Sequence, residues 1–289
     1  MTIKVEVAAK SACALGEGPA WDHRTNTLYF VDIYGKRVFN FDPATNSLKS
    51  FETNLSPGAV IPCDNGKLLL AMDDGIYTAN PDGSGLSQIH SIEAEISSNR
   101  MNDAKCDSAG VLFGGTMGDG ATPTGNLYRI SKDNFSLVRS GVTVSNGLAW
   151  SPDQTKMYYI DSALQSVLVA DFDPETSSVQ AFAEFVSFPK EFGIPDGMCA
   201  DLEGGIWVAY FFGKAVRRFD KNGRQTHIIE MPVSQVTSCA FAGEGSTKLF
   251  ITTASVDVGD GKWPEKDAGH LFVADTGIPG QGTSLFKLN

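Results

Sequence analysis

Short runs of apolar residues recur at regular intervals along the chain, each following a polar turn. They cover residues 28–31, 68–70, 111–113, 157–160, 206–208 and 249–251, and their starts lie 40, 43, 46, 49 and 43 residues apart. A repeat of this length, with several short strands in each unit, is the sequence signature of a β-propeller blade. The pattern therefore predicts an all-β fold: one six-bladed β-propeller domain over residues 1–289, with four antiparallel strands per blade.

The first repeat shows how each blade is predicted to be built. Residues 18–21, 28–32, 37–41 and 48–51 have the pattern of four strands, ordered from the centre of the ring outwards. The turns between them contain Asp, Asn and Pro, for example Asp42-Pro43, and these residues supply the backbone angles that hairpin turns require. A further strand is predicted around residues 3–7. We expect it to complete the last blade and so close the ring.

The composition narrows the classes of function. Of the 289 residues 42% are hydrophobic, enough for blades to pack face to face, and no long stretch keeps the period of a helix. The formal net charge of −11 argues against nucleic acid, which binds clustered Lys and Arg. An acidic chain is compatible with a cation held in a central channel. A surface charge that keeps the protein soluble is the simpler explanation of the net negative charge.

The cysteines and the hydropathy pattern predict a cytoplasmic protein. The five cysteines are scattered and odd in number, which indicates reduced thiols and neither a disulfide framework nor a thiolate metal site. The N-terminus lacks the uninterrupted apolar core of a signal peptide, and no stretch approaches the 18 apolar residues of a membrane span. We expect a small molecule as partner, no nucleic acid, no membrane, and a monomer or weak homo-oligomer.

Four polar residues occupy matching places in four of the repeats. Glu17, Asn102, Asn146 and Asp196 precede the apolar run of their repeat by 11, 9, 11 and 10 residues. Side chains at equivalent places in radially arranged blades converge on the axis of the ring. Carboxylate and amide oxygens favour a hard cation such as Ca²⁺, Mg²⁺ or Mn²⁺, with Zn²⁺ or Fe²⁺ possible where carboxylates dominate. The sequence therefore predicts one divalent metal ion on the central axis.

Several of these residues also have a plainer interpretation. Asn146-Gly147 and Asp196-Gly197 are common turn dipeptides, and each taken alone favours a turn. Arg100 either projects toward the same mouth as Asn102 or is a surface charge. Trp21 and Trp150 favour packing between blades. Recognition is expected on the loops 117–125, 188–194 and 255–268, because loops on a rigid scaffold usually carry it.

Six segments of the chain resemble one known family in the right order. They are residues 16–21, 99–103, 115–117, 145–151, 158–162 and 194–198, which read GEGPAW, NRMND, GTM, SNGLAWS, YYIDS and IPDGM. They are similar to the senescence marker protein-30 (regucalcin), gluconolactonase and luciferin-regenerating enzyme family, from about residue 14 to the C-terminus. The resemblance implies a six-bladed propeller with one divalent metal on its axis, and many members hydrolyse sugar lactones.

The resemblance also implies roles for individual residues. Glu17, Asn146 and Asp196 match the metal ligands, with Asp196 also the proposed base, and Arg100 and Asn102 match substrate-contacting positions. Where several relatives carry two acidic residues after the Gly-Thr-Met motif, this chain retains only Asp119. Asp119 is therefore a candidate substrate contact, and the substrate preference of relatives does not transfer.

Together these observations predict a metal-dependent lactonase of the gluconolactonase type, acting on aldonolactones. The metal would polarise the lactone carbonyl while Asp196 serves as general base. Two alternatives stay open: a metal-dependent phosphotriesterase, and a non-enzymatic calcium-binding protein of the regucalcin or luciferin-regenerating type.

Overall fold

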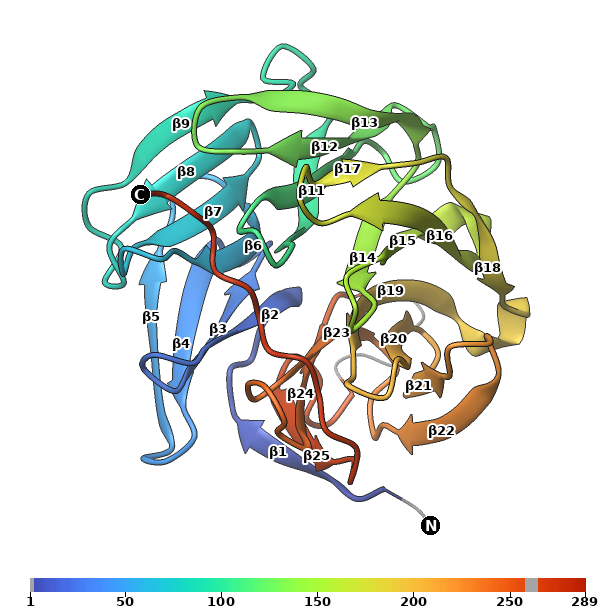
Figure 1. The fold of residues 1–289 in the computed structure, drawn as a ribbon. Coiled ribbons are helices and arrows are strands. Elements are labelled where there is room, and N and C mark those ends of the chain that lie inside the picture. Colours follow the sequence, from blue (N-terminus) through green and yellow to red (C-terminus); the bar gives the residue numbers. More distant parts are fainter. Residues whose placement is uncertain (1–2, 258–264) are drawn as a thin grey trace.

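The computed structural model describes residues 3–257 and 265–289, in which six antiparallel sheets surround a central axis (Figure 1). The first three sheets, in chain order, consist of β2 (Gly16–Asp22), β3 (Thr27–Asp32), β4 (Arg37–Asp42) and β5 (Ser47–Glu52); β6 (Pro57–Pro62), β7 (Leu68–Met72), β8 (Gly75–Ala79) and β9 (Ser87–Ser91); and β10 (Arg100–Cys106), β11 (Leu112–Met117), β12 (Gly125–Ile130) and β13 (Phe135–Val142).

The remaining sheets complete the ring. They consist of β14 (Ser145–Trp150), β15 (Lys156–Asp161), β16 (Ser166–Asp173), β17 (Ser178–Val179) and β18 (Ala183–Ser187); β19 (Ile194–Ala200), β20 (Ile206–Phe211), β21 (Ala215–Phe219) and β22 (Gln225–Glu230); and β23 (Val236–Phe241), β24 (Lys248–Thr253), β25 (Leu271–Asp275) and β1 (Val5–Ala9). Two single-turn 3₁₀ helices, η1 (Ser162–Leu164) and η2 (Lys190–Phe192), lie between strands. The predicted six-bladed propeller is confirmed. No helix in residues 3–257 and 265–289 is long and apolar enough to cross a membrane.

One blade departs from the predicted four strands. Its outer strand is divided into β17 and β18, which pair with opposite ends of β16. Between them the chain leaves the ladder at Phe182, whose ring packs on Tyr159 with centroids 5.5 Å apart. β17 and β18 together occupy the outer edge of this blade, with the Phe182 contact between them.

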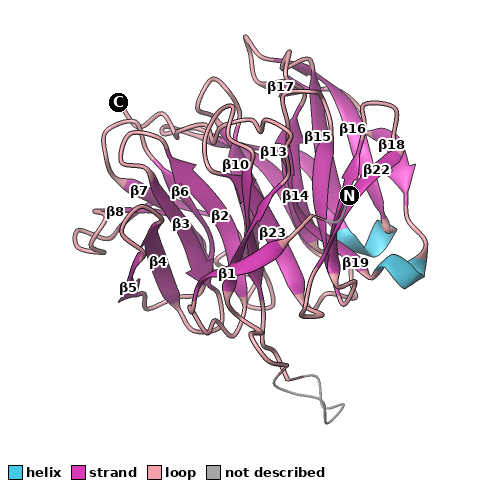
Figure 2. Cartoon of the chain, turned by 90° about the horizontal axis from the view of Figure 1, so that it is seen from below, coloured by secondary structure: helices cyan, strands magenta, loops and turns pink. Residues whose placement is uncertain are grey.

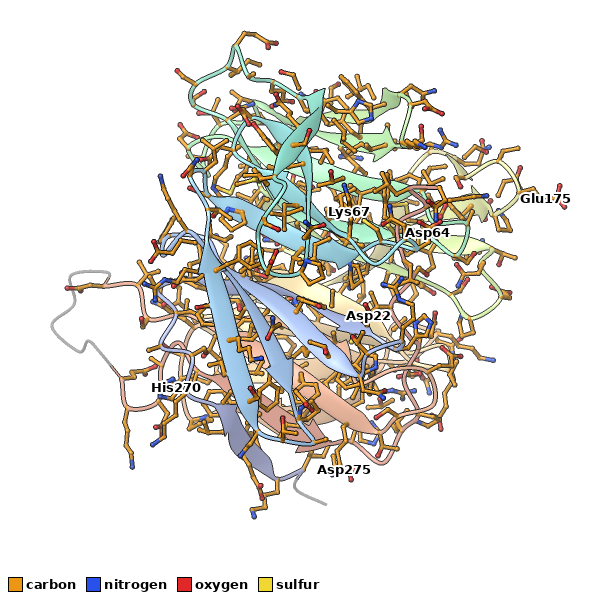
Figure 3. The ribbon with its side chains drawn as sticks, turned by 90° about the vertical axis from the view of Figure 1, so that its left-hand side faces the viewer. Asp22, Asp64, Lys67, Glu175, His270 and Asp275 are labelled. Atoms are coloured by element: carbon orange, nitrogen blue, oxygen red, sulfur yellow. The ribbon has the colours of Figure 1, made fainter. Side chains whose placement is uncertain are left out.

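The two ends of the described chain hold the ring together. β1 pairs with β25, so the N-terminal strand completes the last blade as predicted. The C-terminal segment 277–289 crosses one face of the ring (red in Figure 1) and hydrogen-bonds to several blades. Its Gln281 amide donates to the Ala200 carbonyl, and its Phe286 amide donates to the Pro62 carbonyl. Asp22 and Asp64 lie toward this face, and His270 lies toward the opposite one (Figure 3).

The core consists of six apolar clusters, one at each contact between neighbouring blades. Trp21 stacks on Phe250 of the last blade with ring centroids 6.2 Å apart, and Trp150 meets Phe113 of the preceding blade at 5.7 Å. Both tryptophans therefore pack between blades, as the sequence indicated. The innermost strands β6, β14 and β23 are buried along their whole length, because each lies between two neighbours.

Every innermost strand carries a register shift at an equivalent place. In the four blades that contain the predicted site residues the shift falls between Glu17 and Ala20, Met101 and Ala104, Asn146 and Leu148, and Pro195 and Met198. A β-bulge of this kind adds a residue to one strand and re-aims its side chains. The repeated bulge explains why polar side chains from different blades turn to the axis.

Candidate functional site

A pocket of about 330 Å³ lies on the axis at the end where the innermost strands begin. This is the face that carries η1 and η2, opposite the face that the C-terminal segment crosses (Figure 2). Its base is lined by five of the six predicted site residues, which come from β2, β10, β14 and β19: Glu17, Arg100, Asn102, Asn146 and Asp196. The structure thus brings together side chains separated by up to 179 positions in the chain.

Glycines after the site residues allow neighbouring strands to approach at the axis. A Cβ atom on Gly197 would lie 2.0 Å from Ser238 Oγ, and one on Gly147 would lie 2.8 Å from the Asp196 carbonyl oxygen. Both glycines belong to strands, β19 and β14. The alternative interpretation of Asn146-Gly147 and Asp196-Gly197 as turn dipeptides is therefore wrong. Close packing of backbones, rather than a turn, requires glycine here.

The two amide side chains are held in fixed orientations. Asn146 Nδ2 donates to Ser162 Oγ at 2.9 Å, and that hydroxyl donates to the Pro195 carbonyl at 2.6 Å. Arg100 Nη1 donates to Asn102 Oδ1 at 2.7 Å, and Asn102 Nδ2 donates to the Ser145 carbonyl at 2.8 Å. Because Ser162 accepts from its nitrogen, the orientation of the Asn146 amide is fixed; its Oδ1 accepts from Asn102 Nδ2 at 3.4 Å and keeps a second lone pair for a ligand. Arg100 is therefore part of the site and not a surface charge.

Glu17 and Asp196 form an unusual pair of buried carboxyl groups. Burial raises the pKa of Glu17 well above its ordinary value, and the negative charges of Asp196 and Asp103 raise it further. Burial likewise raises the pKa of Asp196, followed by the charge of Asp103, while a hydrogen bond with Asn146 and the charge of Arg100 act in the opposite direction. Burial disfavours the charged form of a carboxyl group, whereas nearby positive charge favours it. A cation between these two groups would supply that positive charge.

The donor set fits a hard divalent cation with few protein ligands. The described part of the chain contains no group of three or more His, Cys, Asp or Glu side chains arranged to hold a metal. A cation at this site would therefore depend on the carboxylates of Glu17 and Asp196 together with the amide oxygen of Asn146. All three are oxygen donors, the type that Ca²⁺, Mg²⁺ and Mn²⁺ prefer. Three protein ligands would leave coordination positions for water and substrate.

A third buried acid lies beside the site on β10 and escaped the sequence interpretation. Asp103 follows Asn102 on β10, and burial raises the pKa of its carboxyl group. Its Oδ1 accepts from the Ala104 amide at 2.8 Å. Below it Lys105 Nζ donates to the Met198 carbonyl at 2.6 Å. The signal for Asp103 was its place inside the NRMND motif, but its neighbour Asn102 matched the repeat position and Asp103 did not.

Asp119 is not brought together with the other predicted residues. Its Oδ1 accepts from the amides of Ala121 and Thr122 at 2.9 and 2.7 Å, and its Oδ2 accepts from Thr122 Oγ1 at 3.0 Å. These hydrogen bonds lower the pKa of the exposed Asp119 carboxyl group and hold it in its own turn. Met117 and Gly120 of the same loop do line the pocket. A role for Asp119 in substrate binding stays a prediction.

The three predicted recognition loops differ in whether they line the pocket. Loop 117–125 contributes Met117 and Gly120 to the pocket, and the end of loop 188–194 contributes Ile194. Loop 255–268 lies partly outside the described residues. The sequence interpretation missed Tyr34 and Phe211, which also line the pocket. Phe211 ends β20 opposite Ile194, and Tyr34 lies in the turn after β3, so both lie outside the inner-strand positions at which the repeat was compared.

These features define a six-bladed propeller with an oxygen-lined, acidic centre on its axis. Residues 15–255 match the family described as SMP-30/Gluconolactonase/LRE-like region, and the chain belongs to this family. It is 33% identical over 270 residues to a Bacillus subtilis (strain 168) protein named "Putative sugar lactone lactonase YvrE", with 92% of each chain covered.

Two solved structures are similar over nearly the whole chain. A luciferin-regenerating enzyme has a TM-score of 0.92 and 32% identity, covering 99% of this chain and 100% of its own. Regucalcin from Agrobacterium tumefaciens str. C58, described as a calcium-binding protein, has a TM-score of 0.92 and 25% identity, covering 100% of this chain and 98% of its own. The family resemblance predicted from the motifs is thus confirmed.

Proposed function

We propose that this protein is a divalent-metal-dependent lactonase that hydrolyses sugar lactones. The observation that carries the proposal is the pair of buried carboxyl groups, Glu17 and Asp196, brought by two blades to the base of one pocket beside the oriented amide of Asn146. Membership of the family and the similarity to a protein named as a sugar lactone lactonase support the same chemistry. The calcium-binding description of regucalcin supports a divalent cation.

The residues of the pocket would have different roles in the reaction. Glu17, Asn146 and Asp196 would hold the cation, which when bound supplies a Lewis acid for the lactone carbonyl and lowers the pKa of water. Asp196 accepts a proton from the attacking water and returns it to the ring oxygen as the carbon–oxygen bond breaks. Arg100 donates to oxygen atoms of the substrate, and its hydrogen bond to Asn102 fixes the direction of that donation.

The protonation state of the Asp196 carboxyl group depends on burial and on nearby positive charge. Burial alone favours the protonated carboxyl group, which cannot accept a proton. A bound cation lowers the pKa of a neighbouring carboxyl group. Asp196 is therefore a better proton acceptor while a cation is held at the site, and this links metal binding to turnover.

The cysteines support the inference of a cytoplasmic protein. All five, Cys13, Cys63, Cys106, Cys199 and Cys239, are buried and unpaired. The sulfur atoms of Cys199 and Cys239 lie 3.6 Å apart without a bond between them. Free thiols at this separation persist in a reducing compartment.

One experiment separates the proposal from its alternatives. The protein is stripped of metal with a chelator, single metals are restored, and a panel of lactones and phosphotriesters is assayed. The proposal expects lactone hydrolysis that disappears on chelation and returns with metal. Hydrolysis of phosphotriesters alone would identify the second class of hydrolase, and calorimetric calcium binding without turnover would identify a binding protein.

A further inference from the structure

Gln165 lines the pocket with a side-chain oxygen that has no hydrogen-bond partner. The residue directly follows η1, the single helical turn whose first residue, Ser162, orients the amide of Asn146. Its side chain lines the same pocket as the two buried carboxyl groups. The Oε1 atom is buried and accepts no hydrogen bond from the described part of the chain. Most buried polar atoms in proteins are paired, so an unpaired oxygen in a pocket indicates a place for a ligand.

The backbone of Gln165 is tied down on both sides. Its φ of 53° and ψ of 37° lie in the left-handed region, which residues other than glycine adopt uncommonly. Its amide donates to the Ser162 carbonyl at 3.3 Å, and its carbonyl accepts from the Phe188 amide at 2.7 Å. Any adjustment of Gln165 to a ligand therefore falls on its side chain.

The side chain of Gln165 is suited to such an adjustment. The terminal torsion of a glutamine side chain is broad, so the amide turns easily. Turning Oε1 toward the pocket breaks none of its hydrogen bonds, because it accepts none from the described residues. A hydrogen-bond donor in the pocket would give this oxygen the partner that it lacks, and leaving a buried oxygen unpaired is unfavourable.

The polar groups of the pocket complement one another. Arg100 offers only N–H donors, Gln165 offers an oxygen acceptor, and the hydroxyl of Tyr34 can serve as either. Hydroxyl groups both donate and accept, so a substrate that carries several can satisfy all three residues. A phosphotriester has no O–H group to donate to Gln165. The polar lining thus favours a hydroxylated substrate.

We propose that Gln165 is a specificity-determining residue whose Oε1 accepts a hydrogen bond from one hydroxyl group of the sugar lactone. The inference rests on the proposed lactonase function and narrows its substrate to lactones with a free hydroxyl group at the carbon that lies nearest η1. A lactone without that hydroxyl group leaves the Gln165 oxygen unpaired and is a poorer substrate.

A series of lactones that each lack one hydroxyl group tests the assignment. δ-Gluconolactone and its analogues deoxygenated at carbon 2, 3, 4 or 6 are compared by kcat/KM, with metal present, in the wild type and in Gln165→Met. Methionine resembles glutamine in length but has no amide oxygen. For one analogue, the ratio of kcat/KM for gluconolactone to that for the analogue should be about 5- to 150-fold lower in Gln165→Met than in the wild type, the effect of one unpaired neutral group. The other ratios should be the same in both proteins.

Gln154→Met is the matched control. Gln154 is also a half-buried glutamine with a left-handed backbone, at φ 58°, but it lies between β14 and β15, outside the pocket. This variant should keep every wild-type ratio. If Gln165→Met also keeps every ratio, the assignment is overturned. A uniform fall in kcat/KM for all lactones in Gln165→Met would overturn it too, because a residue that only supports η1 would give that result.

A binding assay separates failure of this inference from failure of the proposed function. δ-Gluconolactam, with a ring amide in place of the ring ester, resists hydrolysis, and it and its monodeoxy analogues are titrated by calorimetry. If no lactone is turned over but loss of one lactam hydroxyl weakens binding to the wild type more than to Gln165→Met, the assignment of Gln165 stands and the lactonase proposal fails. If lactones are turned over but each hydroxyl contributes the same affinity in both proteins, the lactonase proposal stands and the assignment fails. Neither lactam binding nor lactone turnover would refute both.

Discussion

Replacing Ser162 by alanine should weaken metal binding without touching a metal ligand. The Ser162 hydroxyl accepts from Asn146 Nδ2 at 2.9 Å and donates to the Pro195 carbonyl at 2.6 Å, and the side chain is buried. Its loss frees the Asn146 amide to rotate, so the amide oxygen is no longer directed at a cation. Groups that orient a metal ligand in this way contribute about 10- to 100-fold to affinity.

The same change has a separate cost in stability. Asn146 Nδ2 and the Pro195 carbonyl each lose a buried partner, and an unsatisfied buried group costs about 1–3 kcal/mol. We therefore expect Ser162→Ala to lower the free energy of unfolding of the metal-free protein by about 2–6 kcal/mol, measured by urea denaturation. Metal affinity is measured by calorimetry with Mn²⁺ at a temperature where both proteins are folded.

Ser177→Ala provides the matched control. Ser177 is also buried, and its hydroxyl donates to Asp107 outside the pocket. This variant should lose stability but bind Mn²⁺ as the wild type does. If Ser162→Ala binds Mn²⁺ with the same affinity as Ser177→Ala, the orientation of Asn146 does not control the site, and the assigned hydrogen-bond chain has no function.

Two further substitutions test the carboxyl pair and the packing at the axis. Glu17→Gln should abolish metal content measured by elemental analysis while circular dichroism stays unchanged. The metal-free variant should unfold at the wild-type temperature or above, because a neutral amide replaces a buried carboxyl group whose charged form burial disfavours. Full metal occupancy would take Glu17 out of the site. Gly197→Ala should lower the free energy of unfolding, measured by urea denaturation, by about 1–3 kcal/mol through overpacking. The reason is that the added Cβ would lie 2.5 Å from Ser238 Cβ. A variant as stable as the wild type would show that β19 and β23 can separate at no cost.

The sequence carried the blade pattern and most of the site because both repeat. Each apolar run marks the second strand of its blade, and Glu17, Asn146 and Asp196 stand at one place in three repeats. The bulges that aim these side chains at the axis were not foreseen, since a bulge depends on pairing with a neighbouring strand. The roles of the residues remain predictions that the geometry supports.

Residues without a repeated position could not be found in this way. Tyr34, in the turn after β3, and Phe211, the last residue of β20, reach the pocket because different blades meet at its mouth, and nothing in the local sequence records that meeting. Asp119 shows the converse case. Its motif position suggested a substrate contact, yet the amides of its own turn occupy the carboxylate, because an Asp two residues before a backbone amide readily forms an Asx turn.

The most direct test of the central claim is lactone hydrolysis by Asp196→Asn across a titration of metal. The asparagine oxygen can still bind a cation, but the amide cannot accept a proton. The account predicts turnover of δ-gluconolactone about 10²–10⁴-fold below wild type even at saturating metal, the usual contribution of a general base. Full recovery of turnover at high metal would contradict it, and would leave Asp196 as a ligand only.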